Sequence, residues 1–95
     1  MKQLLSLNNY AIITGAAGLL GYFHAEALAE RKINLILIDL NKKNLEKISK
    51  ILKKKYKKLK IIYKVVDITN ESKIQKFFGE LKIKKIKFKY LINNA

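Results

Sequence analysis

The sequence predicts an α/β protein whose strands and helices alternate in the order βαβαβαβ. Four short apolar runs alternate with three stretches in which apolar residues recur every three or four positions. The apolar runs are almost continuous, which is typical of parallel strands that helices cover on both faces of a sheet. Each stretch between two runs is also long enough to form the crossover helix that parallel strands need.

The first half of the chain contains two of the predicted strands and two of the predicted helices. The strands cover residues 10–14 and 33–39. The first helix should start near Gly18 and bury an apolar face that consists of Leu19, Leu20, Phe23, Ala27 and Leu28. We expect Asn41 to cap the second helix, because an asparagine side chain accepts a hydrogen bond from a first-turn amide. The apolar face of that helix consists of Leu45, Ile48, Leu52, Tyr56 and Leu59.

The second half continues the alternation and determines the predicted topology. A third strand at residues 61–67 precedes a third helix, which Thr69 or Asn70 can cap. The apolar face of the third helix consists of Ile74, Phe77, Phe78 and Leu81. A fourth strand then covers residues 87–95. Right-handed crossovers place the first two helices on one face of the sheet and the third on the other. The predicted strand order is therefore 3-2-1-4, the first half of a doubly wound sheet.

Composition excludes several classes of site. The 95 residues suffice for one small domain. The chain has no cysteine, so disulfides and thiolate metal sites are excluded, and its one histidine, His24, cannot build a metal cluster alone. Charged residues interrupt the apolar stretches, so we expect no membrane span. The apolar run within residues 1–7 is too short for a signal peptide, and we expect a cytoplasmic protein.

The net charge of +14 comes almost entirely from lysine. Residues 42–60 hold ten lysines and one acidic residue, Glu46, so most of the excess lies in one segment. A basic segment can bind nucleic acid through phosphates, and a basic nucleotide- or nucleic-acid-binding module is one alternative for this chain. Base-specific proteins favour arginine, however, and Arg31 is the only one here. We therefore interpret the lysines as a solvated face and expect no specific nucleic acid partner.

A glycine-rich turn follows the first predicted strand. The glycines Gly15, Gly18 and Gly21 are spaced three residues apart, and the last two lie at the start of the first predicted helix. Gly15 permits the tight turn, Gly18 leaves room for a pyrophosphate, and Gly21 lets the helix pack closely on the sheet. Amides at the helix N-terminus would then face the negative charge. The alternative is a glycine-containing turn with no ligand.

An acidic residue at the end of the second strand strengthens the dinucleotide interpretation. Asp39 follows Gly15 by 24 residues, and a carboxylate there can accept hydrogen bonds from the adenosine ribose 2′-hydroxyl. The same carboxylate repels a 2′-phosphate, and no basic residue lies in the glycine turn. This favours NAD over NADP, although Lys42 and Lys43 leave NADP open. The alternative for Asp39 is a polar strand end.

The chain resembles the short-chain dehydrogenase/reductase family along its whole length. The resemblance rests on the glycine spacing, Asp39, the Asp67-Ile68 pair and the terminal residues 93–95, each at the end of a predicted strand. It implies a partial Rossmann domain over residues 1–95, in which Asp67 contacts the adenine amino group, Ile68 lines the adenine pocket and Asn93 braces the sheet. The cofactor-binding residues it implies are Gly15, Ala17, Gly18, Leu19, Leu20, Gly21, Asp39, Leu40, Asp67, Ile68, Asn94 and Ala95.

Two departures from the family pattern shape the functional prediction. The glycine spacing is that of the extended branch, which includes nucleotide-sugar epimerases and dehydratases, whereas Asn-Asn-Ala at residues 93–95 is typical of the single-domain branch, which we favour. The family's catalytic serine and Tyr-x-x-x-Lys pair lie beyond Ala95. We therefore predict that the chain is the cofactor-binding part of an oxidoreductase and is inactive alone. We expect the full-length parent protein to act on a small carbonyl, alcohol or sugar and to form a homo-oligomer. Tyr56 and Lys60 also match Tyr-x-x-x-Lys, by chance in so lysine-rich a chain.

Overall fold

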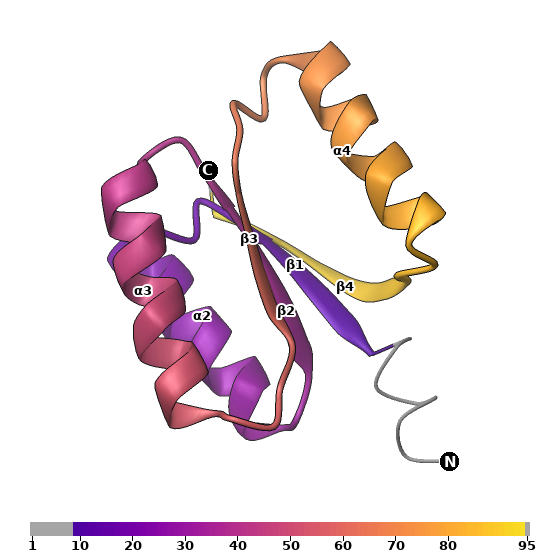
Figure 1. Ribbon diagram of the computed structural model, residues 1–95. Helices are drawn as coiled ribbons and strands as arrows, with labels where there is room; N and C mark the ends of the chain where they lie inside the picture. Colours follow the sequence, from indigo (N-terminus) through magenta and orange to yellow (C-terminus); the bar gives the residue numbers. More distant parts are fainter. Residues whose placement is uncertain (1–8, 95) are drawn as a thin grey trace.

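The computed structural model describes residues 9–94, which fold as alternating strands and helices around one sheet (Figure 1). The predicted order βαβαβαβ is confirmed. The elements are β1 (Tyr10–Thr14), α2 (Leu19–Glu30), β2 (Asn34–Asp39), α3 (Lys42–Lys55), β3 (Ile61–Val65), α4 (Glu71–Ile83) and β4 (Phe88–Asn93).

The four strands form one parallel sheet in the order β3-β2-β1-β4, as the sequence predicts. The two most apolar strands, β1 and β2, therefore lie in the middle of the sheet. In the register between them, Ile12 pairs with Ile36. Both of these side chains are fully buried. Because all strands run the same way, the segments that follow them meet at one edge, and we call this edge the carboxyl edge.

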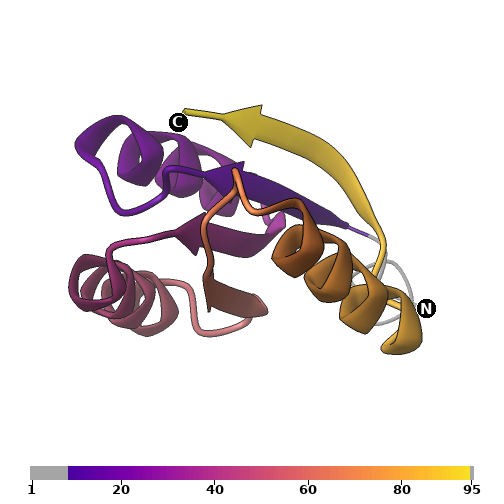
Figure 2. The ribbon, with the colours of Figure 1, turned by 90° about the horizontal axis from the view of Figure 1, so that it is seen from above.

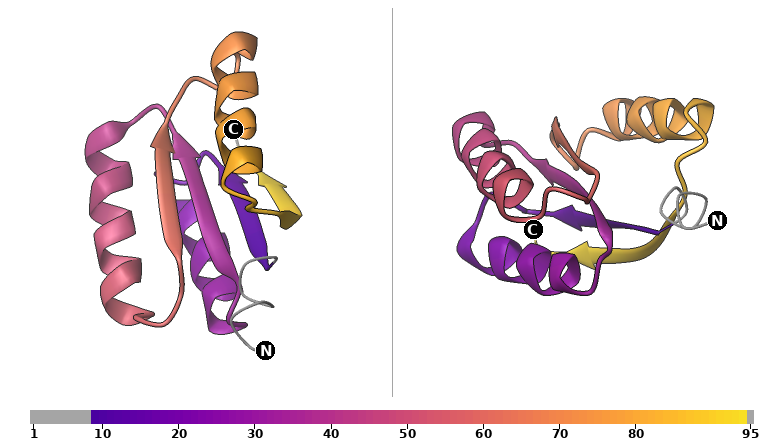
Figure 3. Two further views of the ribbon diagram at one scale, coloured as in Figure 1. Left: turned by 45° about the vertical axis from the view of Figure 1, so that its right-hand side comes forward. Right: turned by 60° about the horizontal axis from the view of Figure 1, so that its bottom comes forward.

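The helices form a layer on each face of the sheet, as Figures 2 and 3 show. Helices α2 and α3 cover one face, over a core that includes Ala11, Ile13, Leu35 and Leu37. Helix α4 covers the other face and packs Phe77 and Leu81 against a second cluster, which includes Tyr10, Ile12, Ile36 and Ile38. The two clusters follow the alternation of side chains along β1 and β2. This arrangement confirms the predicted placement of the helices.

The predicted apolar face of α2 is wrong except at Leu28, which is half-buried and packs against the core under this helix. Leu19, Leu20 and Phe23 are 74%, 60% and 53% exposed, and Ala27 is exposed as well. The face that meets the sheet consists of the small residues Gly21, Ala25 and Ala29. The physical reason is distance: small residues let the helix axis approach the strands closely, whereas the larger residues turn outward.

Helices α3 and α4 largely match their predictions, including their caps. The side chain of Asn41 accepts a hydrogen bond from Asn44 N at 3.1 Å, and that of Asn70 accepts one from Lys73 N at 3.2 Å. Asn70 is therefore the α4 cap and Thr69 is not. Helix α3 ends earlier than predicted, because Tyr56 is its C-cap residue and Leu59 lies in the following turn.

The strand ends also differ slightly from the predicted bounds. Strand β3 ends at Val65, so Asp67 lies in the loop after it, and β2 begins at Asn34. Strand β4 covers Phe88–Asn93, shorter at both ends than predicted, and Ala95 lies outside the described residues. Phe78 of α4 is partly exposed and stacks on Phe88, with ring centroids 6.0 Å apart. Over residues 9–94, no helix is long and apolar enough to cross a membrane.

Candidate functional site

The glycine turn at the carboxyl edge connects β1 to α2. Gly15 has a φ of 65°, a left-handed conformation that glycine adopts without steric cost. The turn is held by backbone hydrogen bonds from Ala16 N to Ile38 O at 3.1 Å and from Gly18 N to Gly15 O at 3.3 Å. Its path is therefore set by the end of β2 as well as by its own residues.

Gly21 and Gly18 differ in what surrounds them. A Cβ atom at Gly21 would lie 2.8 Å from Ala16 Cα and would also clash with the Gly15 carbonyl oxygen. Gly21 is thus required for close packing of α2 on the turn, whereas the sequence predicted a close approach to the sheet. A Cβ atom at Gly18 would meet Gly15 O at 3.6 Å, an ordinary contact. The protein's own packing does not require glycine there, so the role predicted for Gly18 concerns a ligand.

The N-terminus of α2 presents its amides without a side-chain cap. Within the described chain, Gly18 is the N-cap residue and supplies no side-chain hydrogen bond, whereas asparagines cap α3 and α4. The first helical turn contains no acidic residue. First-turn amides, here including those of Leu19 and Leu20, have no partner within a helix, and the helix dipole favours a negative charge beside them. This end of α2 is suited to an anion.

Asp39 lies beside the turn and bonds two backbone amides. Its Oδ2 atom accepts a hydrogen bond from Ala17 N at 2.9 Å, and Oδ1 accepts one from Asn41 N at 3.0 Å. The side chain therefore links the glycine turn to the start of α3. Each carboxylate oxygen can accept further hydrogen bonds, so these two bonds leave acceptor capacity for a ligand.

A small cavity of about 120 Å³ opens between the ends of β1, β2 and β3. Its lining joins residues from three predicted motifs with one further residue, Val66; the motif residues are Gly15, Asp39, Leu40, Asp67 and Ile68. Sequence reasoning missed Val66, which it treated as an ordinary strand residue. The available signal was its position directly before Asp67, at the end of a predicted strand.

Asp67 is held in place by the residue two positions further on. Its Oδ1 atom accepts hydrogen bonds from Thr69 Oγ1 at 2.6 Å and from Thr69 N at 2.9 Å. Both bonds lower the pKa of the Asp67 carboxyl below its ordinary value of 3.8, and the bond from the Thr69 hydroxyl has the larger effect. The group is therefore ionised near neutral pH and can accept a hydrogen bond from an amino group.

The end of β4 completes the edge on the far side of β1. The Thr14 hydroxyl donates a hydrogen bond to Asn93 Oδ1 at 2.9 Å, and Asn94 N donates one to Thr14 O at 3.3 Å. The Nδ2 atom of Asn94 is buried and has no hydrogen-bond partner among residues 9–94. A buried donor without a partner is costly, so an acceptor atom of a ligand beside it would be stabilising. Thr14 was not predicted as a site residue.

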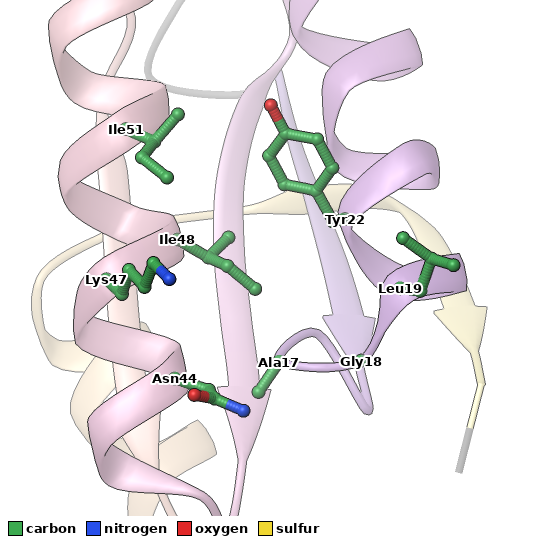
Figure 4. A pocket seen from close by; sticks show the side chains of 8 residues that line it. All are labelled: Ala17, Gly18, Leu19, Tyr22, Asn44, Lys47, Ile48 and Ile51. Carbon is green, nitrogen blue, oxygen red and sulfur yellow. The ribbon is translucent and has the colours of Figure 1, made fainter.

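A groove of about 340 Å³ runs from the glycine turn between α2 and α3 (Figure 4). Ala17 and Gly18 lie at one end of it, and α2 and α3 form its two walls. Its polar side chains are those of Asn44 and Lys47, and Tyr22 supplies an aromatic ring. Its aliphatic side chains are Leu19, Ile48 and Ile51. Sequence reasoning missed this groove, although Asn44, Ile48 and Ile51 share one face of α3 at helical spacing.

Other candidate sites lie elsewhere or were not found. Tyr56 lines a separate cavity with Asn9, which precedes β1, and Asn34, which begins β2. This cavity lies at the edge of the sheet opposite the glycine turn. This placement supports the interpretation that Tyr56 and Lys60 match the catalytic pattern by chance. In the described ranges, no group of three or more histidine, cysteine or acidic residues could hold a metal ion.

Comparison with known proteins identifies the family. The sequence model of the short chain dehydrogenases matches residues 9–95. The chain belongs to the short-chain dehydrogenase family. It is 34% identical over 84 residues to a short chain dehydrogenase/reductase of Gibberella zeae, covering 88% of this chain and 30% of that protein. It is 38% identical over 57 residues to the very-long-chain 3-oxoacyl-CoA reductase-B of Danio rerio, covering 60% of this chain and 18% of that one. The chain thus spans a third or less of these relatives' length.

Solved structures of two dehydrogenases and a reductase show the same fold. The NAD⁺-bound xylitol dehydrogenase has a TM-score of 0.83 at 29% identity, over 94% of this chain and 34% of that one. A ketone-specific alcohol dehydrogenase of Comamonas testosteroni has a TM-score of 0.78 at 28% identity, over 92% and 35%. The L-sorbose reductase of Gluconobacter frateurii has a TM-score of 0.82 at 22% identity, over 93% and 33%, and this likeness concerns the fold alone. The chain corresponds to about a third of each.

Proposed function

We propose that this chain binds a nicotinamide dinucleotide through its adenosine and pyrophosphate half, at the carboxyl edge of the sheet. The observation that carries the proposal is the meeting of two complementary features at this edge. The uncapped N-terminus of α2 suits a phosphate group, and the cavity beside Asp39 suits a ribose and a base. The similar xylitol dehydrogenase was solved with NAD⁺, which supports this class of ligand.

The residues present fit such a group. The pyrophosphate would lie at the first-turn amides of α2, where Gly18 presents no side chain. The ribose hydroxyls would donate to Asp39, and the adenine would enter the cavity beside Leu40, Asp67 and Ile68. The buried Nδ2 atom of Asn94, which has no partner within residues 9–94, gains one if the ligand reaches the end of β4. Leu19 and Leu20, both exposed, would meet the ligand beyond the pyrophosphate.

NAD is the preferred cofactor in this proposal. The ionised form of Asp39 accepts hydrogen bonds from a 2′-hydroxyl and repels a 2′-phosphate. The turn itself contributes only glycine, alanine and leucine between Gly15 and Gly21, so it offers a 2′-phosphate no cation. Lys42 and Lys43 lie at the exposed start of α3, where ions and solvent screen their charge.

The binding proposal is tested by titrating the chain with NAD and NADP in a calorimeter. We expect saturable binding of NAD, with NADP at least tenfold weaker. Gly18→Val and Asp39→Ala should each weaken NAD binding at least tenfold. Gly79→Ala is the matched control, since a Cβ atom at Gly79 in α4 would meet nothing within 4 Å in the described structure. Unchanged NAD affinity in both site variants would contradict the proposal.

The parent activity is proposed from the family and from the length of the match. We propose an oxidoreductase of the cytoplasm, a homo-oligomer that acts on a small carbonyl, alcohol or sugar, of which these 95 residues supply cofactor binding but no hydride transfer. The support is that the chain corresponds to about a third of its relatives. An assay with NADH and a panel of carbonyl compounds should show no rate enhancement by the chain. A clear enhancement would contradict this part of the proposal.

A further inference from the structure

The Asp39 carboxylate joins two segments that surround the proposed phosphate site. One segment is the glycine turn, whose Ala17 amide bonds Oδ2 at 2.9 Å. The other is the start of α3, where the amide of the cap residue Asn41 bonds Oδ1 at 3.0 Å. Both bonds exist without any ligand. Hydrogen bonds from amides to an ionised carboxylate are stronger than those between neutral groups, so they hold the turn effectively.

The amide of Ala17 lies next to the groups that would receive the pyrophosphate. Ala17 is followed by Gly18, the N-cap residue of α2, and then by the first-turn residues Leu19 and Leu20. The neighbouring bonds that hold this stretch come from the backbone, at Ala16 and Gly18. Asp39 therefore supplies a side-chain bond at the point where the turn becomes the helix. A shift of Ala17 would displace the amides that face the phosphate.

We propose that Asp39 is a positioning residue for the phosphate-binding turn, in addition to its predicted contact with the ribose. This inference rests on the proposed function and deepens it. Asp39 presets the conformation of the turn, so the affinity for a pyrophosphate depends on Asp39 even when the ligand offers it no ribose hydroxyl. A residue that served only as a hydroxyl acceptor would have no such effect.

The sign of the effect separates this role from simple electrostatics. The carboxylate of Asp39 is negative, and a pyrophosphate is negative as well. Removing the carboxylate therefore strengthens anion binding if charge repulsion is the dominant effect. Our proposal predicts the opposite, because the misplaced amides of Leu19 and Leu20 no longer converge on the phosphate.

The first measurement is amide hydrogen exchange of the ligand-free chain, followed by NMR. We expect the Ala17 and Asn41 amides to exchange at least tenfold faster in Asp39→Ala than in the wild type. Asp67→Ala is the control for this measurement, because the Asp67 carboxylate bonds Thr69 in the same region. It should leave the exchange of Ala17 unchanged. Unchanged exchange of Ala17 in Asp39→Ala would overturn the proposal.

The second measurement uses ADP and 2′,3′-dideoxy-ADP, which carry the same pyrophosphate with and without the ribose hydroxyls. We expect Asp39→Ala to weaken the binding of dideoxy-ADP at least fivefold, and that of ADP further. Equal or tighter binding of dideoxy-ADP by the variant would overturn the proposal. If the wild type binds neither ligand, the proposed function fails, while hydrogen exchange still decides whether Asp39 holds the turn.

The variant Asp39→Asn covers the case in which Asp39→Ala does not fold. Asparagine has nearly the same shape but keeps one oxygen acceptor, so it can hold one of the two amides. We expect rapid exchange at either Ala17 or Asn41, protection at the other, and an affinity for dideoxy-ADP between those of the wild type and a variant without any acceptor. Full protection of both amides in a folded Asp39→Asn variant would contradict the positioning role.

Discussion

The hydroxyl of Thr14 donates a hydrogen bond to Oδ1 of Asn93 across 2.9 Å, and this bond joins the last residues of β1 and β4. Thr14 is the residue before the glycine turn, and Asn93 is the residue before Asn94. The bond therefore connects two parts of the proposed site that are 79 residues apart. It gives Asn93 the bracing role that the family resemblance implies.

Replacing Thr14 with valine should remove this bond while keeping the shape of the side chain. A hydrogen bond of this kind contributes about 1 kcal/mol to the free energy of unfolding, and we expect a loss of that size. The measurement is urea denaturation of Thr14→Val, Asn93→Ala and the double variant. A coupling energy near zero between the two positions would show that the bond contributes nothing to stability.

Gly21→Ala should destabilise the protein, because its Cβ atom would lie 2.8 Å from Ala16 Cα on the turn. Overpacking of this kind costs about 1–3 kcal/mol. The matched control is Gly79→Ala in the exposed part of α4, where alanine should stabilise the helix by about 0.5–1 kcal/mol. The two unfolding free energies should thus change in opposite directions. A neutral Gly21→Ala variant would contradict the close approach of α2 to the turn.

An ion pair between α2 and α3 should make stability depend on pH. Lys55 Nζ lies 2.6 Å from Glu26 Oε2, and this hydrogen bond lowers the pKa of Glu26 below 4.5 and raises that of Lys55 above 10.5. The contribution of Glu26 to the free energy of unfolding is present above pH 4.5 and is lost as the pH falls through the folded-state pKa of Glu26. The contribution of Lys55 is present below pH 10.5 and is lost as the pH rises through its folded-state pKa.

Lys55→Gln tests this pair. The wild type should be more stable than the variant between pH 4.5 and pH 10.5, and the difference should shrink outside that range. Thermal unfolding across pH measures it. A difference that is constant from acid to neutral pH would contradict the assignment to the pair.

The low pKa of Asp67 should rise when Thr69 loses its hydroxyl. Thr69→Ala removes the side-chain bond at 2.6 Å and leaves the backbone bond at 2.9 Å, so the pKa should move toward its ordinary value of 3.8 without reaching it. NMR titration of the Asp67 carboxyl carbon measures the change. A pKa that does not move would show that other groups keep the carboxylate ionised.

Topology and most of the proposed site could be predicted from the sequence, because both depend on local patterns. Continuous apolar runs such as that of β2 identify buried parallel strands, and the residues after each run must then meet at one edge. Gly15, Asp39 and Asp67 can be assigned to that edge because each lies at the end of such a run. The cap residues Asn41 and Asn70 follow from side-chain chemistry at helix starts.

The remaining features depend on distances that a single sequence does not contain. Periodicity suggested that Leu19, Leu20 and Phe23 bury the face of α2, but the helix packs through Gly21, Ala25 and Ala29. The bond from the Ala17 amide to Asp39 joins the glycine turn to β2, and the bond from Thr14 to Asn93 joins β1 to β4. Both depend on tertiary packing. The spacing of residues in the sequence does not predict such hydrogen bonds.

The most direct test of the central claim is to record the amide spectrum of the chain while NAD is added. We predict that the largest shifts map to the glycine turn and the start of α2, to the region of Asp39 and Leu40, to Asp67 and Ile68, and to Asn94. The lysine-rich outer face of α3 should change little. Saturable shifts confined to α3, or no shifts at millimolar NAD in a folded chain, would contradict a dinucleotide site at the carboxyl edge.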